Sequence, residues 1–168
     1  RAPDGYTIHI TPASSTLAAA PHIFKQLPFD PIKDFASVTT INSLTFVVAV
    51  DAAKPMKSIQ ELIQVLKQKP DNGFYGTQSN SGQIAAELFK ANTGLDTVYV
   101  PFKVTGDAFA NLLSGQIDFM SVDSTWAKSQ PKVRILAVTA AKRSSTMPDV
   151  PTLAEAGVPG VDVAPWWG

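Results

Sequence analysis

The chain of 168 residues contains no cysteine. That absence excludes a disulfide framework, a catalytic thiol and any metal site built on thiolates. It does not decide the compartment, because many proteins of oxidising compartments also lack disulfides. Long apolar runs are missing as well. The longest, Phe46–Val50 and Ile135–Ala141, fall far short of the roughly 20 residues that a membrane-spanning helix needs.

Neither sign of charge is in excess, since 14 Lys and Arg balance 14 Asp and Glu. No stretch gathers basic residues into the kind of stripe that neutralises nucleic-acid phosphates. Nucleic acid and anionic membrane surfaces are therefore not expected as partners. The hydrophobic content of 45% and charged content of 17% predict a folded globular protein with a substantial core.

Residues that commonly carry catalysis are scarce. His9 lies within a predicted strand and His22 follows a proline, and neither has an Asp or Ser at a spacing that suggests a triad. Asp30 and Asp34 flank a proline rather than forming a cluster of metal ligands. The sequence also lacks a G-x-S-x-G elbow, a Walker loop and a G-x-G-x-x-G fingerprint. We expect no catalytic residue, no metal and no cofactor.

Apolar runs alternate with helical patterns along the chain, which is typical of an α/β fold with crossover connections. The clearest helix start is Ser58, which forms an S-x-x-E capping box with Glu61. The predicted extended segments are Tyr6–Thr11, Val38–Ile41, Phe46–Val50, Phe74–Thr77, Thr97–Val100, Ile117–Val122, Val133–Thr139 and Val161–Ala164. The predicted helices are Ser14–Ala20, Ile59–Lys69, Ile84–Asn92, Ala108–Leu113 and a brief Thr152–Ala156.

The chain is predicted to pass between two lobes near Val48–Ala53 and again near Val138–Lys142. On that division, residues 1–50 form part of lobe one, residues 51–139 form lobe two, and residues 140–168 return into lobe one. The lobe of residues 51–139 is then of ordinary domain size. The arrangement predicts a cleft between two α/β halves.

The most informative segment runs from a predicted strand end into a predicted helix start. Its polar residues are Thr77, Gln78, Ser79, Asn80, Ser81 and Gly82. Unpaired N–H groups at a helix N-terminus favour an anion, and hydroxyl groups supply neutral donors. This pattern suits a carboxylate and needs no arginine. The alternative is a polar turn that only caps the helix. Because ligands of open α/β sheets lie outside the carboxyl ends of strands, the position favours binding.

Three further strand ends carry polar or aromatic side chains. The pairs are Phe102 with Lys103, Asp123 with Ser124, and Ser14 with Ser15. Each pair alone could have only a structural role. If the sheets are parallel, the strand ends meet at one edge and together describe a polar-rimmed cleft. Trp166 and Trp167 would form either an aromatic wall of that cleft or part of a core.

Short motifs in order along the whole chain resemble those of the Bug family, the extracytoplasmic receptors of tripartite tricarboxylate transporters. The matching segments are Pro3-Asp4-Gly5-Tyr6-Thr7, Leu27-Pro28-Phe29-Asp30-Pro31, Lys57-Ser58 with Glu61-Leu62-Ile63, Glu87-Leu88-Phe89, Val100-Pro101-Phe102-Lys103, Leu112-Leu113-Ser114-Gly115-Gln116-Ile117-Asp118, Leu136-Ala137-Val138-Thr139, Pro148-Asp149-Val150-Pro151-Thr152 and Glu155-Ala156-Gly157. Two segments depart from the pattern by being shorter. They are the loop before Gln83-Ile84, where His-Leu is usual, and the stretch Thr125–Lys132.

The resemblance implies a two-lobed periplasmic binding protein of the type II-like class, with one lobe complete here and the other partial. It implies a receptor that captures a small carboxylate, such as a di- or tricarboxylate, an aromatic acid or an amino acid. The implied partners are that ligand and the membrane subunits of a transporter, and the implied location is the periplasm. We expect a monomer. A signal peptide and the remainder of lobe one are expected beyond the two ends of this chain.

Two other classes of function stay open beside the receptor. The ligand-sensing domain of a transcription regulator shares the two-lobed fold and would bring a helix-turn-helix segment. A small α/β enzyme is the third class, and the missing nucleophile and base argue against it. The N-terminus of the complete protein would separate the three, since it carries a signal peptide, a helix-turn-helix segment or neither.

Overall fold

The computed structural model describes residues 4–69 and 71–168, and the chain divides into two compact units. Unit 1 is Arg1–Leu44 with Pro165–Gly168, and unit 2 is Thr45–Ala164. The first passage between units therefore comes earlier than the predicted one, and the second comes later. Strand β2 (Phe46–Asp51) lies wholly in unit 2, and after strand β6 (Val133–Val138) the chain stays with that unit.

The segment that follows β6 belongs to unit 2 because its side chains fill that unit's core. Val138 forms a parallel bridge with Thr152, and the amide of Leu153 donates to the carbonyl of Val138 at 3.0 Å. Leu153, Val158 and Val161 are all buried. The brief helix predicted at Thr152–Ala156 is a series of turns, and Val161–Ala164 forms no regular strand.

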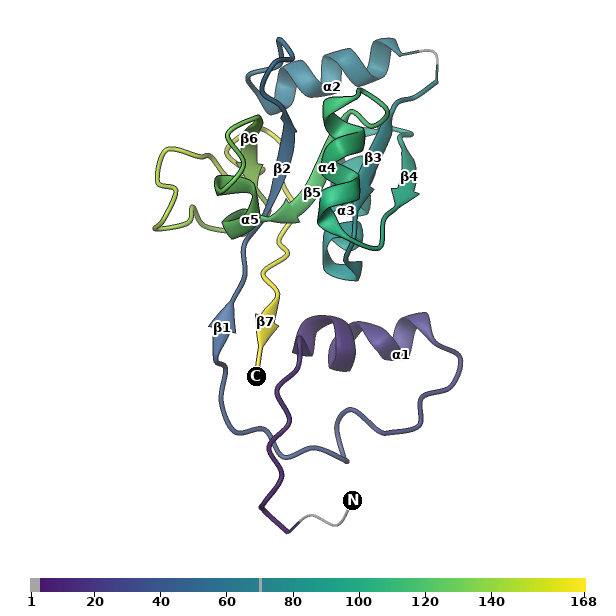
Figure 1. Ribbon diagram of the computed structural model, residues 1–168, viewed down its shortest axis with the longest axis vertical. Helices are drawn as coiled ribbons and strands as arrows, with labels where there is room; N and C mark the ends of the chain where they lie inside the picture. The colour runs from purple at the N-terminus through teal and green to yellow at the C-terminus, as the bar shows by residue number, and fades with distance from the viewer. Residues whose placement is uncertain (1–3, 70) are drawn as a thin grey trace. The chain divides into compact units, whose positions relative to one another are not determined.

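A five-stranded mixed sheet forms the centre of unit 2 (Figure 1). Its order is β4 (Val98–Pro101), β3 (Phe74–Thr77), β5 (Phe119–Asp123), β2 and β6. Strand β3 is parallel to β4 and to β5, whereas β2 is antiparallel to both of its neighbours. The carboxyl ends of β3, β4, β5 and β6 therefore share one edge of the sheet with the amino end of β2. We call this edge the carboxyl edge.

Helices cover both faces of the sheet. Helices α2 (Ile59–Gln68) and α3 (Asn80–Thr93) supply residues to one core cluster, and α4 (Thr105–Leu113) and α5 (Ser124–Lys128) supply residues to the other. Alternate residues of β2 point into each cluster: Val48 and Val50 into the first, Val47 and Ala49 into the second.

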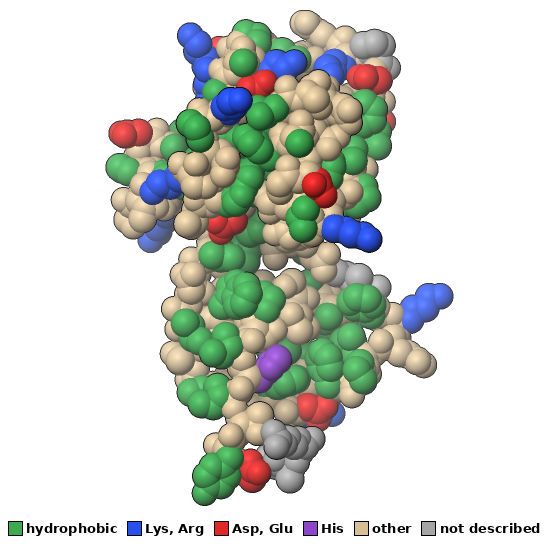
Figure 2. Space-filling model, viewed as in Figure 1, with side chains coloured by type: hydrophobic (Ala, Val, Ile, Leu, Met, Phe, Trp, Pro, Cys, Tyr) green, Lys and Arg blue, Asp and Glu red, His purple; other side chains and the backbone are tan. Residues whose placement is uncertain are grey.

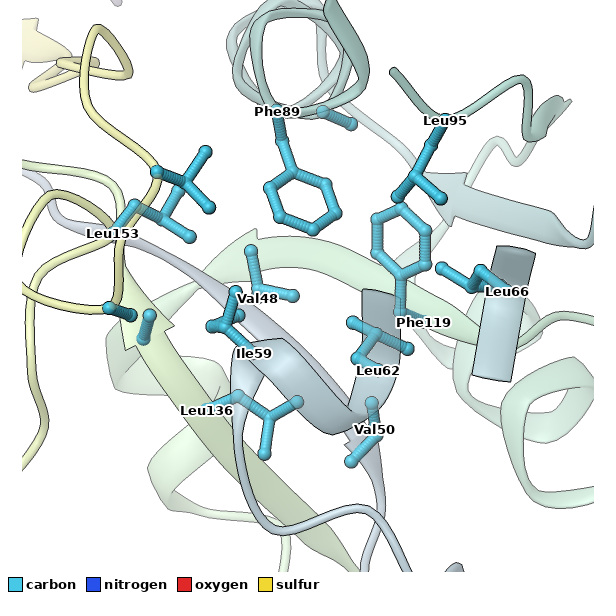
Figure 3. Close-up of a cluster of buried hydrophobic side chains, with 14 of the residues drawn as sticks. Val48, Val50, Ile59, Leu62, Leu66, Phe89, Leu95, Phe119, Leu136 and Leu153 are labelled. Carbon is cyan, nitrogen blue, oxygen red and sulfur yellow. The ribbon is translucent and has the colours of Figure 1, made fainter. Parts of the chain in front are cut away.

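Figure 3 shows the first cluster, in which Phe89 of α3 and Leu62 of α2 point toward Phe119 of the sheet. The rings of Phe89 and Phe119 meet edge to face, with centroids 5.7 Å apart. Burying a side chain of this size contributes roughly 1.5–3 kcal/mol, so the cluster holds both helices firmly on the sheet.

The start of α3 differs from the predicted one. The sequence pattern predicts a turn over Ser79–Gly82 and a helix from Ile84, but the helix begins at Asn80. Ser79 is the N-cap, and its hydroxyl accepts a hydrogen bond from the amide of Gly82 at 3.1 Å. The predicted turn is thus the first turn of the helix. The helix ends at Gly94, a glycine in the left-handed conformation at φ 65°.

Unit 1 contains little regular structure. A π-helical segment η1 (Ser14–Ala19) runs into α1 (Ala20–Ile23), and β1 (Asn42–Ser43) pairs antiparallel with β7 (Trp166–Trp167). The helix predicted to end at Ala20 thus continues past Pro21 to Ile23.

The two strands predicted for unit 1 do not form. Tyr6–Thr11 has no strand partner among the described residues, although Thr11 exchanges backbone hydrogen bonds with Gly168. Val38–Ile41 is irregular up to β1. Tyr6 and Val38 are 93% and 87% exposed, and hydrophobic side chains of unit 1 are visible on the surface in Figure 2. Pro3 of the predicted opening turn lies outside the described residues.

The N-cap of α2 gives a test of this fold. The hydroxyl of Ser58 accepts from the amide of Glu61 at 3.2 Å, and the carboxylate of Glu61 accepts from the amide of Lys57 at 2.7 Å. Ser58→Ala should lower the free energy of unfolding by about 1 kcal/mol, because the Glu61 amide loses its acceptor. Ser58→Asp should retain stability, because aspartate caps equally well. Chemical denaturation measures both variants, and equal loss in both would contradict the capping interpretation.

Candidate ligand-binding site

The N-terminus of α3 lies at the carboxyl edge of the sheet, directly after β3. Two of its first amides already have acceptors: that of Gly82 donates to the Ser79 hydroxyl, and that of Gln83 donates to the Ser79 carbonyl at 2.9 Å. Within residues 4–69 and 71–168, the amides of Asn80 and Ser81 have no acceptor. Two N–H groups at the positive end of a helix of this length favour an anion.

Thr77 and Gly82 bring the helix backbone against the sheet. Thr77 is only 1% exposed, and its hydroxyl accepts from the amide of Ser79 at 3.3 Å. A Cβ atom on Gly82 would lie 2.2 Å from the Thr77 Oγ1 and 2.9 Å from the Ser121 carbonyl oxygen. Residue 82 must therefore be glycine for α3 to sit where it does. In this structure both residues position the helix.

Three other side chains predicted for the site keep their polar groups available. Ser81 is 8% exposed, and in the described part of the chain its hydroxyl has no hydrogen-bond partner. Gln78 and Asn80 are exposed, and no protein group in that same part bonds to their side-chain amides. Ser79 differs from them because its hydroxyl is engaged in capping. The available donors are thus neutral hydroxyl and amide groups.

The end of β5 lies at the same edge. Asp123 pairs in register with Phe46 of β2, and its carboxylate accepts from the amide of Trp126 at 2.9 Å. The amide of Ser124 donates to the carbonyl of Thr45 at 2.8 Å. Asp123 therefore caps α5, and Ser124 fixes the start of α5 to the segment that enters β2.

The end of β4 contributes less than the sequence pattern suggests. The amide of Phe102 donates to the Thr77 carbonyl at 3.3 Å, so the backbone of β4 continues beside the site. The ring of Phe102, however, packs into the second core cluster, where a Cβ atom on Gly76 would lie 2.7 Å from it. Lys103 is exposed. Phe102 is thus a partly buried residue that packs against the core, and Lys103 supplies a cation on the surface near this strand end.

Ser14 and Ser15 belong to unit 1, and each hydroxyl has a partner within that unit. The Ser14 hydroxyl accepts from the amide of Trp166 at 3.0 Å, and the Ser15 hydroxyl donates to the Pro12 carbonyl at 3.1 Å. Trp166 and Trp167 form β7 and are 41% and 38% exposed, so they are not core residues.

Three residues at the carboxyl edge are absent from the sequence-based site. A Cβ atom on Gly82 would meet the Phe46 ring at 2.9 Å, and Thr139, at the end of β6, bonds to the Phe46 carbonyl. Ser121 is 1% exposed, and its hydroxyl lacks a partner among the described residues. No sequence signal marks them, because Phe46 reaches this edge only through the antiparallel direction of β2, and the positions of Ser121 and Thr139 depend on the order of strands in the sheet.

A stack of aromatic rings around Tyr75 of β3 holds helix α3 against the sheet. The ring of Tyr75 stacks between Tyr99 and Phe119, with centroid distances of 5.2 and 5.4 Å. The hydroxyl of Tyr75 donates to the Glu87 carboxylate of α3. Burial, and then the bond to Glu87, raise the pKa of the Tyr75 phenol far above its usual value. Tyr75 is therefore a neutral donor that ties α3 to β3.

The described ranges contain neither a candidate metal site nor a candidate membrane-spanning helix. No group of three His, Cys, Asp or Glu side chains is arranged to hold a metal ion. No helix has the length and apolar character required to cross a bilayer.

An α/β/α unit that the chain enters and leaves at one edge, and that presents a helix N-terminus with neutral donors there, is typical of one lobe of a periplasmic binding protein. A family model described as "Tripartite tricarboxylate transporter family receptor" matches residues 1–168. The chain belongs to this receptor family. Family members are transport receptors of the periplasm, so the class is not one of enzymes.

Individual relatives agree with this assignment. The "UPF0065 protein in tcbD-tcbE intergenic region" of Pseudomonas sp. (strain P51) is 30% identical over 98% of this chain and 50% of its own length. Periplasmic binding protein BugD is 26% identical with a TM-score of 0.82, over 100% of this chain and 57% of that chain. Rpa4515 of R. palustris with adipate is 32% identical with a TM-score of 0.76, over 86% and 50%. The chain thus spans about half the length of the curated relatives it matches.

The close packing at Gly82 yields a prediction with an internal control. Gly82→Ala should lower the free energy of unfolding by about 1–3 kcal/mol, because the new methyl group overlaps Thr77 and the Ser121 backbone. Gly106→Ala, in helix α4, places its methyl group in open space. That variant should be as stable as the native protein or up to about 1 kcal/mol more stable. Thermal denaturation of both variants measures the difference, and an unaffected Gly82→Ala would contradict the packing described above.

Proposed function

We propose that this protein is a periplasmic receptor that captures a small carboxylate and delivers it to the membrane subunits of a tripartite tricarboxylate-type transporter. The observation that carries the proposal is the pair of unbonded amides of Asn80 and Ser81 at the carboxyl edge. They lie at the N-terminus of α3, beside the unbonded Ser81 hydroxyl.

The chemistry of these donors suits a carboxylate. The helix dipole stabilises an anion at such a terminus by roughly 0.3–2 kcal/mol. Each hydrogen bond to a charged acceptor adds roughly 1.5–3 kcal/mol. Two amides and one hydroxyl can therefore hold a carboxylate group without a cation. The exposed side-chain amides of Gln78 and Asn80 are further donors for the rest of the ligand.

The relatives support a ligand with more than one carboxylate. The related Rpa4515 has a solved structure with adipate, a dicarboxylate, and the family is described as tricarboxylate transporter receptors. Lys103, exposed after β4, is the cation that we assign to a second carboxylate. Asp123 and Ser124 stay within the proposed site as residues that shape it. We propose a monomer as the working form.

Membership of a transport receptor family disfavours the other two classes. A sensing domain of a transcription regulator would share the fold but not the family, and an enzyme would need reactive groups. No feature of the carboxyl edge favours a sensing domain or an enzyme. The polar groups that the α3 N-terminus and the end of β5 present there are amides, hydroxyls and the capping carboxylate of Asp123.

Calorimetric titration of the complete natural protein with adipate and citrate tests the proposal. Ser81→Ala should weaken binding roughly tenfold, because one hydrogen bond to a charged oxygen is lost. Its melting temperature should hardly change, since the Ser81 hydroxyl bonds to no described protein group. Thr77→Ala is a poorer probe, because Thr77 is buried and bonded to the Ser79 amide, so stability and affinity should fall together.

Ser145→Ala serves as the matched control, because Ser145 is an exposed serine without a hydrogen bond in the loop after β6. It should bind as the native protein does. A diamide of the same chain length as adipate should not bind, since it lacks the negative charge. Unchanged affinity in Ser81→Ala, or equal binding of the diamide, would show that α3 is not the carboxylate site.

A further inference from the structure

The chain passes between its two units twice, at Leu44–Thr45 and at Ala164–Pro165. On the unit 1 side these two segments are joined by backbone hydrogen bonds. The amide of Leu44 donates to the Pro165 carbonyl at 2.7 Å, and β1 pairs with β7 immediately beyond. The two crossings therefore leave unit 1 as a bonded pair.

On the unit 2 side, both crossing segments are bonded to a single residue, Thr139. Its amide donates to the Phe46 carbonyl at 2.9 Å, and its carbonyl accepts from the Val163 amide at 2.9 Å. Its hydroxyl lies 3.2 Å from the Phe46 carbonyl oxygen and 3.0 Å from that of Val163. Thr139 is 0% exposed, so water does not compete for these bonds.

The two carbonyls do not depend on the hydroxyl equally. A hydroxyl has one hydrogen, so the Thr139 Oγ1 either shares it between the two oxygens or donates to one at a time. The Phe46 carbonyl also accepts from the Thr139 amide, whereas the Val163 carbonyl has no second donor in the described part of the chain. Removal of the hydroxyl thus leaves the Val163 carbonyl without a donor.

The returning segment has few other backbone ties. Pro165 has no N–H, and the amide of Ala164 has no acceptor among residues 4–69 and 71–168. Apart from the bond of the Val163 amide to Thr139, the remaining polar tie is the amide of Ala141, which donates to the Asp162 carboxylate at 3.1 Å. The carbonyl and the hydroxyl of Thr139 therefore hold the Val163 backbone to the sheet at the point closest to the crossing.

We propose that the Thr139 hydroxyl is a positioning group that fixes the spacing of the two crossing segments as they leave unit 2. Between the ties, Ala164 is the residue without a backbone hydrogen bond among residues 4–69 and 71–168, because the Thr45 carbonyl accepts from the Ser124 amide at 2.8 Å. Loss of the hydroxyl leaves the returning segment tied to the sheet by the Val163 amide and the bond between Ala141 and Asp162 alone, so we expect this segment, and with it the link between the units, to become more mobile. For a receptor this would lower the fraction of molecules that are ready to bind, a consequence that rests on the proposed function.

The test compares Thr139→Val, which keeps the shape and loses the hydroxyl, with Thr139→Ser, which keeps the hydroxyl. In Thr139→Val, amide hydrogen exchange at Val163 should rise roughly fivefold to tenfold relative to exchange at the core residue Leu62. The Val163 amide keeps its own bond to the Thr139 carbonyl in this variant. The expected rise reflects a local opening that no longer has to break the bond from the Thr139 hydroxyl to the Val163 carbonyl. Thr139→Ser should match the native protein. Thr139→Ala replaces the valine variant if the latter does not fold.

A second readout reports on the units directly and needs no ligand. Because this chain has no cysteine, Lys33→Cys in unit 1 and Asp96→Cys in unit 2 can be labelled with a donor and an acceptor dye. The distribution of dye distances should be broader in the Thr139→Val background than in the Thr139→Ser background. Equal widths, or exchange that rises equally at Val163 and Leu62, would overturn the proposal. Neither outcome bears on carboxylate binding, which calorimetry tests separately.

Discussion

Strand β2 runs antiparallel to both of its neighbours in the middle of the sheet, with all six of its residues buried. Its direction brings its amino end to the edge where the other four strands have their carboxyl ends. The first crossing from unit 1, the α3 N-terminus and the end of β6 therefore share one edge. Had β2 been parallel, the chain would enter unit 2 at the opposite edge, far from the polar loop.

The packing of α3 makes this edge a candidate binding site. Gly82 allows the helix backbone to touch Thr77 and the Ser121 carbonyl, and the Tyr75 hydroxyl ties the same helix to β3 through Glu87. These contacts fix the helix N-terminus, so its free amides keep one direction without help from a ligand. A preorganised donor set binds with less loss of conformational entropy than a mobile one does. The donors at the start of α3 are neutral amides and a hydroxyl. Selectivity among anionic ligands would therefore depend on the geometry of these donors and on more distant charges.

The sequence predicts most of unit 2 because its signals are local. The capping box at Ser58 and the left-handed glycine at Gly94 mark helix ends whatever surrounds them. In unit 1 the apolar residues around Tyr6 and Val38 have strand-like patterns, yet a strand needs a partner, and the described residues supply none. The role of Phe102 could not be predicted either, because an aromatic side chain after a strand can turn toward the core or toward a ligand.

Amides and hydroxyls at the start of α3 share a property that charged ligand-binding groups lack: they keep one protonation state from acid to alkaline pH. If a carboxylate binds there, acid pH would weaken its binding only through protonation of the carboxylate itself, at roughly pH 4 for an ordinary carboxyl group. Added salt also competes weakly, since no side-chain cation has to be screened at the loop itself. Any contribution of Lys103 would fall with added salt, so a change in ionic strength separates the charged donor from the neutral ones.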